Sequence, residues 1–529
     1  MLERHGVDQT RIFSKRNSLA ETGGSGLFWF LLGLLGCHTS PLVAAPAKEA
    51  VTVLLPTEIQ EIDPRFVGDA YSLKVSRLLF TSLIQIDPFS LEALPELAEE
   101  VTTLDARRYR VRLRTGLRFS DGSPLDANDV MATFESAMDP ELASRYRETY
   151  GRIQSMTAPD LQTVVFTLRE SHATFLTDLE LPILPRRYRH SRVIERRGHV
   201  VGSGAYRLCG QHSRTLTLCA NPYWHRGRAQ VARVRLMIVR DDNTRAMRLL
   251  AGAADLALNT IPPLLIPLFE RDARFDVVSQ KGVATTYIGV RTDSDSLRDR
   301  RVREAIAYAI DRQALIDAKF GGRATLADGF IPEGHWAYDA TLPSYPYRPE
   351  RARALIAEAR RNGVNVGRIR LRTSADRMRL GIGRAVAAML HQVGIEVDVW
   401  PSETATLLED LRHGRFELAI LALPEVFEPH VLSWFFASAH IPTETQVGAN
   451  RWRYKNSALD RLFEQGVKQG DITKRRPIYQ EVQRLLARDL PAIALWHEDN
   501  IAVVRTGQLS RYRVPRDGRL GTLALPAKP

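Results

Sequence analysis

Cysteine is scarce in this sequence, which has three cysteines among 529 residues. The few cysteine and histidine residues do not gather at the spacings of zinc ligands, so we expect no zinc site. The sequence also lacks the G-x-S-x-G and H-E-x-x-H motifs of hydrolytic enzymes. It has no low-complexity tract, no internal repeat and no second long apolar run. We therefore expect no catalytic residues, no metal and no cofactor.

Lysine contributes little to the positive charge, because the basic residues are overwhelmingly arginine. The formal net charge is +12, while charged residues (25%) and apolar residues (44%) stand at ordinary globular levels. The charge could favour anionic ligands or lipid headgroups, but scattered arginine is the simpler interpretation. No nucleic-acid-binding motif accompanies the charge, so we expect no nucleic-acid partner. The length is sufficient for two or three domains with complete cores.

A short apolar run near the amino terminus has the features of an export signal. Basic residues precede it, and residues 27–36 run up to Cys37. About ten apolar residues are too few to cross a bilayer as a helix, but they suit the core of a signal peptide. We therefore expect an exported protein.

The end of this run, residues 34–37 (LLGC), resembles the bacterial lipobox. The resemblance predicts a signal peptide over 1–36 and a lipid anchor on Cys37, where two or more acyl chains give stable anchoring. Ordinary cleavage after residues 45–47 (APA) is the alternative. Because His38 rather than aspartate follows, the resemblance implies the outer membrane of the cell envelope if the cell is Gram-negative.

If Cys37 is lipidated, Cys209 and Cys219 remain as one pair. They flank a turn-like segment, with strand-like residues 205–208 before it and 216–218 after it. A hairpin would bring the two sulfurs together, and the oxidising periplasm permits the bond. This predicts a disulfide; two buried free thiols are the alternative.

The densest local signals lie in residues 93–137. Apolar residues alternate with arginine over 109–114, which predicts a strand with one buried face. Residues 121–124 (DGSP) predict a turn, because glycine tolerates positive φ and proline fixes φ. Asp126 can cap the following helix, and Asp129 suits its positive first turn.

In order, this stretch gives a P-E-L-A-E turn, an alternating strand, a G-x-x-F-x-D-G-x-P-L turn and a capped helix. That order closely resembles the extracellular solute-binding proteins of family 5, which serve peptide and nickel ABC transporters. Further family motifs occur in the right order over the rest of the chain: residues 201–206 (VGSGAY), 221–224 (NPYW), 299–312 (DRRVREAIAYAIDR) and 491–496 (PAIALW).

The resemblance implies an α/β fold of the periplasmic-binding-protein type II kind, bilobal with an additional domain and with the ligand cleft between lobes I and III. We expect these divisions of the chain: signal peptide 1–36, lobe I 50–90, lobe II 91–200, lobe I again 201–286, lobe III 287–495, and lobe I with a tail 496–529. The strand at 491–496 is expected to return the chain to lobe I. Strand and helix alternation within lobe III predicts a parallel α/β layer.

The family's ligand chemistry is implied by one loop. Peptide-binding members hold the peptide α-ammonium with an aspartate in a W-x-x-D-x-x-D-P loop, and residues 422–429 match that loop. Glu425 falls at the ammonium-binding position and Glu428 at the aspartate before proline, while Ala422 replaces the tryptophan. A buried ammonium beside Glu425 would form a strong charge-assisted contact. A solvent-exposed loop acid is the alternative for Glu425.

Three further residues are candidates for the cleft wall. Tyr287 and Arg291 occupy the family's Y-x-x-F-N strand, where Arg291 would suit a carboxylate or phosphate group. Trp434 comes after the loop and could wall the pocket, although a core aromatic cluster with its neighbours is the alternative.

The resemblance implies a monomer that captures peptides by hinge closure and delivers them to an ABC permease in the inner membrane. The alternative is an envelope lipoprotein of the same fold that binds another ligand, such as a metal chelate, haem or a cell-wall fragment, or that acts as a scaffold. An exported enzyme is the least favoured hypothesis.

Overall fold

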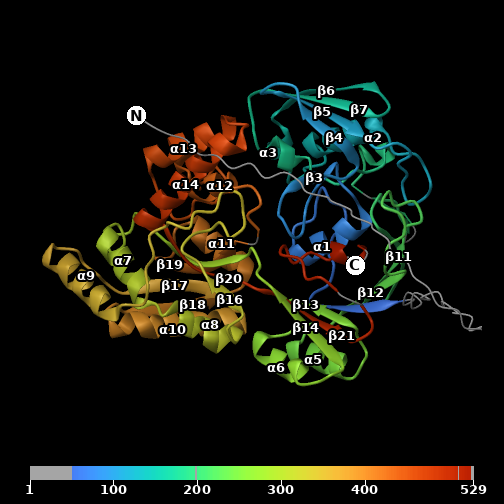
Figure 1. The fold of residues 1–529 in the computed structure, drawn as a ribbon. Helices are drawn as coiled ribbons and strands as arrows, with labels where there is room; N and C mark the ends of the chain where they lie inside the picture. The colour runs from blue at the N-terminus through green and yellow to red at the C-terminus, as the bar shows by residue number, and fades with distance from the viewer. Residues whose placement is uncertain (1–49, 193, 197–198, 424, 510–511, 526–529) are drawn as a thin grey trace, which may run out of the picture. The chain divides into compact units, whose positions relative to one another are not determined.

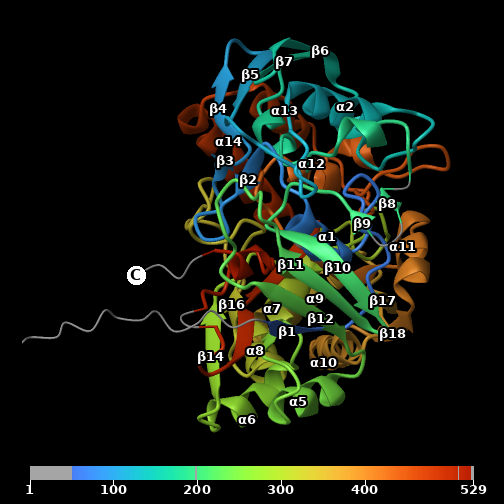
Figure 2. The ribbon, with the colours of Figure 1, turned by 90° about the vertical axis from the view of Figure 1, so that its right-hand side faces the viewer.

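The computed structural model describes residues 50–192, 194–196, 199–423, 425–509 and 512–525. The chain divides into two compact units, Met1–Pro46 and Ala47–Pro529. The first unit lies outside the described residues, as do the predicted signal peptide, Cys37 and the alternative cleavage site. The second unit contains the described helices and strands (Figures 1 and 2).

A four-stranded antiparallel sheet contains the strand predicted within residues 93–137. Its strands, in spatial order, are β4 (Ala98–Thr103), β5 (Arg108–Leu113), β7 (Thr163–Leu168) and β6 (Ile153–Asp160). The alternation predicted for β5 is confirmed, since its apolar residues are buried and its arginines exposed. Helix α2 (Ala127–Met138) begins with the predicted cap: Asp126 and Asp129 form a reciprocal capping box.

A seven-stranded mixed sheet collects strands from three distant parts of the sequence. Its order is β10 (Tyr206–His212), β11 (Thr215–Ala220), β12 (Arg233–Ile238), β1 (Val51–Leu55), β13 (Leu256–Leu258), β21 (Asn500–Arg505) and β14 (Phe275–Gln280). Strand β1 pairs in parallel with β12 and β13, and the remaining pairs are antiparallel. One face packs on α1 (Ala70–Leu79) and the carboxyl-terminal segment, the other on α5 (Asp242–Leu250) and α6 (Ile266–Glu270).

A six-stranded sheet forms the third layer. Its order is β16 (Ala324–Leu326), β20 (Ala492–Glu498), β15 (Thr285–Val290), β19 (Leu418–Leu423), β17 (Ile369–Ser374) and β18 (Val397–Ser402). The predicted parallel layer holds for β17, β18 and β19, but β15 runs antiparallel to both of its neighbours. The sequence predicts that β20 returns the chain to the first lobe. It instead pairs with β15 and β16, and the chain enters the seven-stranded sheet only with β21.

Helices cover both faces of the six-stranded sheet (Figure 1). On one face lie α7 (Arg300–Ala309), α8 (Arg312–Phe320), α9 (Pro349–Arg361) and α10 (Arg377–Gln392). On the other lie α11 (Thr404–Arg412), α12 (Val431–Phe436), α13 (Ser457–Lys468) and α14 (Ile472–Asp489). Gly289 in β15 allows this packing, because a Cβ there would lie 1.9 Å from the Trp452 ring.

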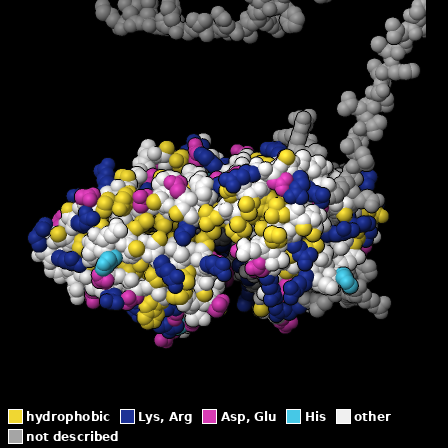
Figure 3. Space-filling view, turned by 90° about the horizontal axis from the view of Figure 1, so that it is seen from below, with side chains coloured by type: hydrophobic (Ala, Val, Ile, Leu, Met, Phe, Trp, Pro, Cys, Tyr) yellow, Lys and Arg dark blue, Asp and Glu magenta, His cyan; other side chains and the backbone are white. Residues whose placement is uncertain are grey.

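Shorter elements complete the described residues: the hairpins β2 (Ile84–Ile86) with β3 (Ala93–Pro95) and β8 (Glu195–Arg196) with β9 (His199–Val200), helices α3 (Arg147–Tyr150) and α4 (Phe175–Asp178), and 3-10 turns η1 (Arg186–Tyr188), η2 (Pro263–Leu265), η3 (Ser438–His440) and η4 (Gly521–Leu523). Among the helices of the described part, none is both long and apolar enough to cross a membrane. On the surface seen from below, basic side chains are interspersed with acidic and apolar ones (Figure 3).

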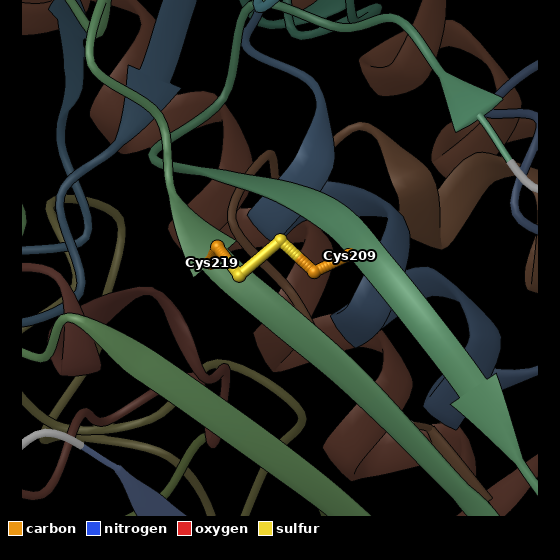
Figure 4. The surroundings of a disulfide bond; sticks show 2 residues. All are labelled: Cys209 and Cys219. Carbon is orange, nitrogen blue, oxygen red and sulfur yellow. A yellow bond between two sulfur atoms is a disulfide. The ribbon is translucent and has the colours of Figure 1, made fainter.

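Cys209 and Cys219 form the predicted disulfide across the β10–β11 hairpin (Figure 4). Their Cα atoms are 5.8 Å apart, within the range that a disulfide spans. The register of the hairpin shifts at Cys209, between Leu208 and Gly210. The disulfide therefore closes a loop on the edge strand of the seven-stranded sheet.

Replacing both cysteines with serine should lower the free energy of unfolding by about 2 to 3 kcal/mol, the chain-entropy effect of so short a loop. Urea unfolding with and without a thiol reductant measures this. The reductant should bring the wild-type protein to the level of the double variant and leave the variant unchanged. If the wild type and the double variant were equally stable without reductant, the disulfide would have no stabilising role.

Candidate functional site

Glu425 lies at the end of β19, in the loop that leaves the six-stranded sheet. Because Leu423 pairs with Thr285, this loop begins beside the first residue of β15. The carboxylate of Glu425 points to the carboxyl-terminal segment, where Oε2 accepts a hydrogen bond of 3.1 Å from Arg519 Nη2. Its side chain is 25% exposed, so it is neither a core residue nor a freely solvated acid.

Arg519 joins three carboxylates from separate parts of the fold. Its Nη1 donates at 2.5 Å to Oε1 of Glu180, a residue that lies just after α4. Its Nε lies 3.3 Å from Asp517 Oδ2. The guanidinium also lies over the Phe427 ring, 4.8 Å from the centroid. Arg519 is 8% exposed, so these contacts replace most of its hydration.

The turn that carries Arg519 is fixed by the neighbouring strand. Asn500 in β21 donates to the carbonyl oxygens of Pro515 and Arg516 at 3.0 and 2.7 Å. Gly518 has a φ of +63°, and a Cβ there would lie 2.9 Å from Asn500 Oδ1. In Figure 1 the segment after this turn, drawn in red, passes beside α1. The position of the guanidinium is therefore set by the fold rather than by a loose tail.

Helix α1 adds two cations. Arg77 pairs with Glu180 at 3.1 Å. Burial lowers the pKa of the half-buried Lys74 ammonium, and the negative charges of Glu425 and Asp517 only partly raise it again. We call the set of Lys74, Arg77, Glu180, Glu425, Asp517 and Arg519 the Arg519 cluster; its three cations balance its three carboxylates.

Two carboxylates of the cluster, Glu180 and Asp517, have pKa values shifted in opposite directions. Burial would raise the pKa of Glu180, but the guanidinium groups of Arg519 and Arg77 outweigh it and hold that pKa below its usual range. Burial raises the pKa of Asp517 to about 6, and Arg519 only partly offsets this. Of these two, Asp517 is therefore the one that gains a proton near pH 6.

Arg519 also lines a cavity of about 120 Å³. Its lining includes Arg519, Glu180 and Asp517 from the cluster, together with Trp224 and the apolar end of α1. Nearby, Glu96 pairs with Arg226 and lies 3.2 Å from His225. In the part of the chain that the structure describes, no three His, Cys, Asp or Glu side chains are placed to hold a metal ion.

Glu428, the second acid of the predicted loop, does not join the cluster. Both of its oxygens accept hydrogen bonds from Arg475 in α14, at 2.9 and 2.6 Å. It also accepts from the backbone N–H of His430. These contacts account for a structural role, because a bidentate ion pair uses the carboxylate that a ligand would need.

The other predicted cleft residues lie elsewhere. Tyr287 is 2% exposed and packs against Phe330 and Trp452 in the core. Arg291 lies just beyond the far end of β15, where it pairs with Asp293 and donates to Gly414 O, because β15 runs antiparallel to β19. Trp434 in α12 is half-buried, and its ring centroid lies 4.8 Å from that of His440. The structure therefore brings none of these three to Glu425.

Sequence reasoning missed Arg519, Glu180, Asp517 and Lys74. Each lies far along the chain from Glu425, and no local motif joins them. The available signal was the excess of arginine, which gives no indication of the position at which a guanidinium is buried.

Comparison with known protein families gives a match over most of the chain. The model named "Bacterial extracellular solute-binding proteins, family 5 Middle" matches residues 92–440. Among curated proteins, the glutathione-binding protein GsiB of Escherichia coli O1:K1 / APEC is 27% identical over 482 residues, which cover 87% of this chain and 91% of that protein.

Solved structures share the fold. The ABC transporter substrate-binding protein CtaP from Listeria monocytogenes has a TM-score of 0.80 at 20% identity, covering 90% of this chain and 98% of that one. The oligopeptide-binding protein AppA from Bacillus subtilis, solved in complex with a nonapeptide, has a TM-score of 0.75 at 22% identity and the same coverage. The fold is therefore the mixed α/β fold of type II periplasmic binding proteins.

Proposed function

The chain belongs to the bacterial extracellular solute-binding proteins of family 5, the substrate-binding components of ABC importers, and on that premise we propose that its ligand is a peptide whose α-ammonium contacts Glu425. The observation that carries this proposal is the position of Glu425. It lies in the loop that follows β19, a central strand of the six-stranded sheet, and reaches a cluster shared with α1 and the carboxyl-terminal segment. A carboxylate between two such layers can hold a ligand when the layers close on it.

Two similar proteins support a peptide ligand. GsiB is named for glutathione, and the AppA structure contains a nonapeptide. Capture by closure needs no chemical change in the ligand, so the proposed role is binding and delivery to a permease, not catalysis. Lobe boundaries as predicted, except that lobe III extends through β20 to Glu498, a monomeric state and a lipid anchor on Cys37 at the cell envelope complete the proposal.

Glu425→Ala should weaken peptide binding at least about tenfold, since an ammonium–carboxylate contact in a partly dry site exceeds ~1.4 kcal/mol. Calorimetric titration with a tripeptide measures this. Glu403→Ala, an exposed acid of the same domain, is the control and should bind as the wild type does. Unchanged affinity in Glu425→Ala would remove this residue from the site.

Native mass spectrometry of the protein purified without denaturation identifies what it carries. Co-purifying short peptides would support the peptide proposal. A single metal chelate, haem or cell-wall fragment would support the other envelope role. No ligand, together with no thermal shift across a peptide library, would favour a scaffold.

A further inference from the structure

The bonds of Arg519 to its two partner glutamates are unequal. Glu180 accepts from Nη1 at 2.5 Å and also from Nη2 at 3.4 Å, while Glu425 receives one bond of 3.1 Å from that same Nη2. A guanidinium holds a carboxylate best through two parallel N–H donors. Glu425 is also the more exposed of the two, at 25% against 18%. Glu425 is therefore the partner that Arg519 releases first.

Arg519 keeps its other partners when Glu425 is released. The turn at 515–518 is held by Asn500, and Asp517 Oδ1 accepts from the Arg519 backbone N–H at 2.9 Å. Arg519 and Glu180 both line the 120 Å³ cavity, so the pair that remains stands beside open space. A second cation can thus take the place at Glu425 while Arg519 remains buried and paired.

We propose that Arg519 is a specificity-determining residue that competes with the ligand's ammonium group for Glu425. This rests on the proposed function, because the competing cation is taken to be a peptide α-ammonium. A ligand ammonium gains Glu425 only by displacing a guanidinium that the fold has already placed there. A simple amine without further contacts is then rejected, and a peptide binds only when its backbone and side chains supply the remaining affinity.

The competition also discriminates between charge states of one peptide. A free amino terminus gains the contact with Glu425 at the cost of the Arg519 contact, whereas an acetylated one leaves Arg519 in place. Removing Arg519 should therefore favour the free peptide far more than its acetylated form. The ratio of the two affinities is the measured quantity, because it cancels changes that affect both peptides alike.

The experiment is calorimetric titration of the tripeptide that binds best in a random library, and of its N-acetyl derivative. Arg519→Met should raise the affinity ratio of free to acetylated peptide by about tenfold, or ~1.4 kcal/mol. Arg370→Met is the matched control, because Arg370 holds Glu417 through two N–H donors and neither residue belongs to the Arg519 cluster. Its ratio should equal that of the wild type.

Arg519→Lys provides a second variant if the methionine variant does not unfold cooperatively. Its shorter, compact ammonium cannot span Glu180 and Glu425 as a fork does, so its ratio should also rise. If the wild type binds the free peptide through Glu425 and neither Arg519 variant changes the ratio, the competition is overturned while the proposed function stands. If no peptide binds any of these proteins, both fall together.

Discussion

Arg475→Met should lower the free energy of unfolding by about 3 to 5 kcal/mol, the usual cost of removing one partner from a buried ion pair. Arg475 is 4% exposed and holds both oxygens of Glu428, and its Nε donates to Gly466 O at 2.8 Å. The variant leaves Glu428 a charged carboxylate without its guanidinium in a half-buried position. Reversible urea unfolding measures the loss.

Lys474→Met is the matched control on the same helix. Its ammonium lies 4.0 Å from Asp471, and the two side chains are 71% and 46% exposed. An exposed pair of this kind contributes less than about 1 kcal/mol. Adding Glu428→Gln to Arg475→Met should recover part of the loss, because the unpaired charge is then absent. Similar stability of Arg475→Met and Lys474→Met would contradict this account.

The Glu428→Gln variant also tests whether Glu428, unlike Glu425, has a structural role and no contact with the ligand. If Glu428 belongs to the structural pair, Glu428→Gln changes stability and leaves the affinity for peptides near that of the wild type. If Glu428 contacts the ligand, the affinity falls while the stability holds. The distances to Arg475 favour the first result.

Local patterns predict the parts of the fold that depend on neighbouring residues. The alternation in β5, the capping box of α2 and the Cys209–Cys219 hairpin are each encoded within about a dozen residues. Asp299 caps α7 through an equally local contact, since its side chain accepts from Arg301 N. The family resemblance supplies the order of the layers, which no local pattern contains.

The site could not be predicted in this way, because its members meet only through the tertiary fold. Glu425 and Arg519 are separated by 94 residues, and Glu180 and Arg519 by 339. Motif position places Tyr287 and Arg291 in the cleft, but strand direction decides which end of β15 faces Glu425. The pairing of β15 with β19 joins residues far apart in the sequence, so no local pattern predicts it.

Relative to the wild type, the Asp517→Asn variant should be more stable at neutral pH than it is at acid pH. Burial raises the pKa of Asp517 from its ordinary 3.8 to about 6, so the folded protein holds this proton between those values and the unfolded chain does not. Stability from this group is therefore fully present below pH 3.8 and is lost as the pH rises through about 6. The shift corresponds to about 3 kcal/mol.

The stability difference between Asp517→Asn and the wild type should accordingly rise by about 2.4 kcal/mol between pH 4 and pH 7.5, measured by urea unfolding at each pH. Asparagine resembles the protonated acid, and Oδ1 can still accept from the Arg519 backbone N–H. The charged groups that face Asp517 are Arg519, Glu425, Arg77 and Lys74, and all remain in the variant. Asp276→Asn, exposed on β14, is the control. A difference that is equal at the two pH values would show that Arg519 keeps Asp517 ionised throughout this range and would contradict the raised pKa.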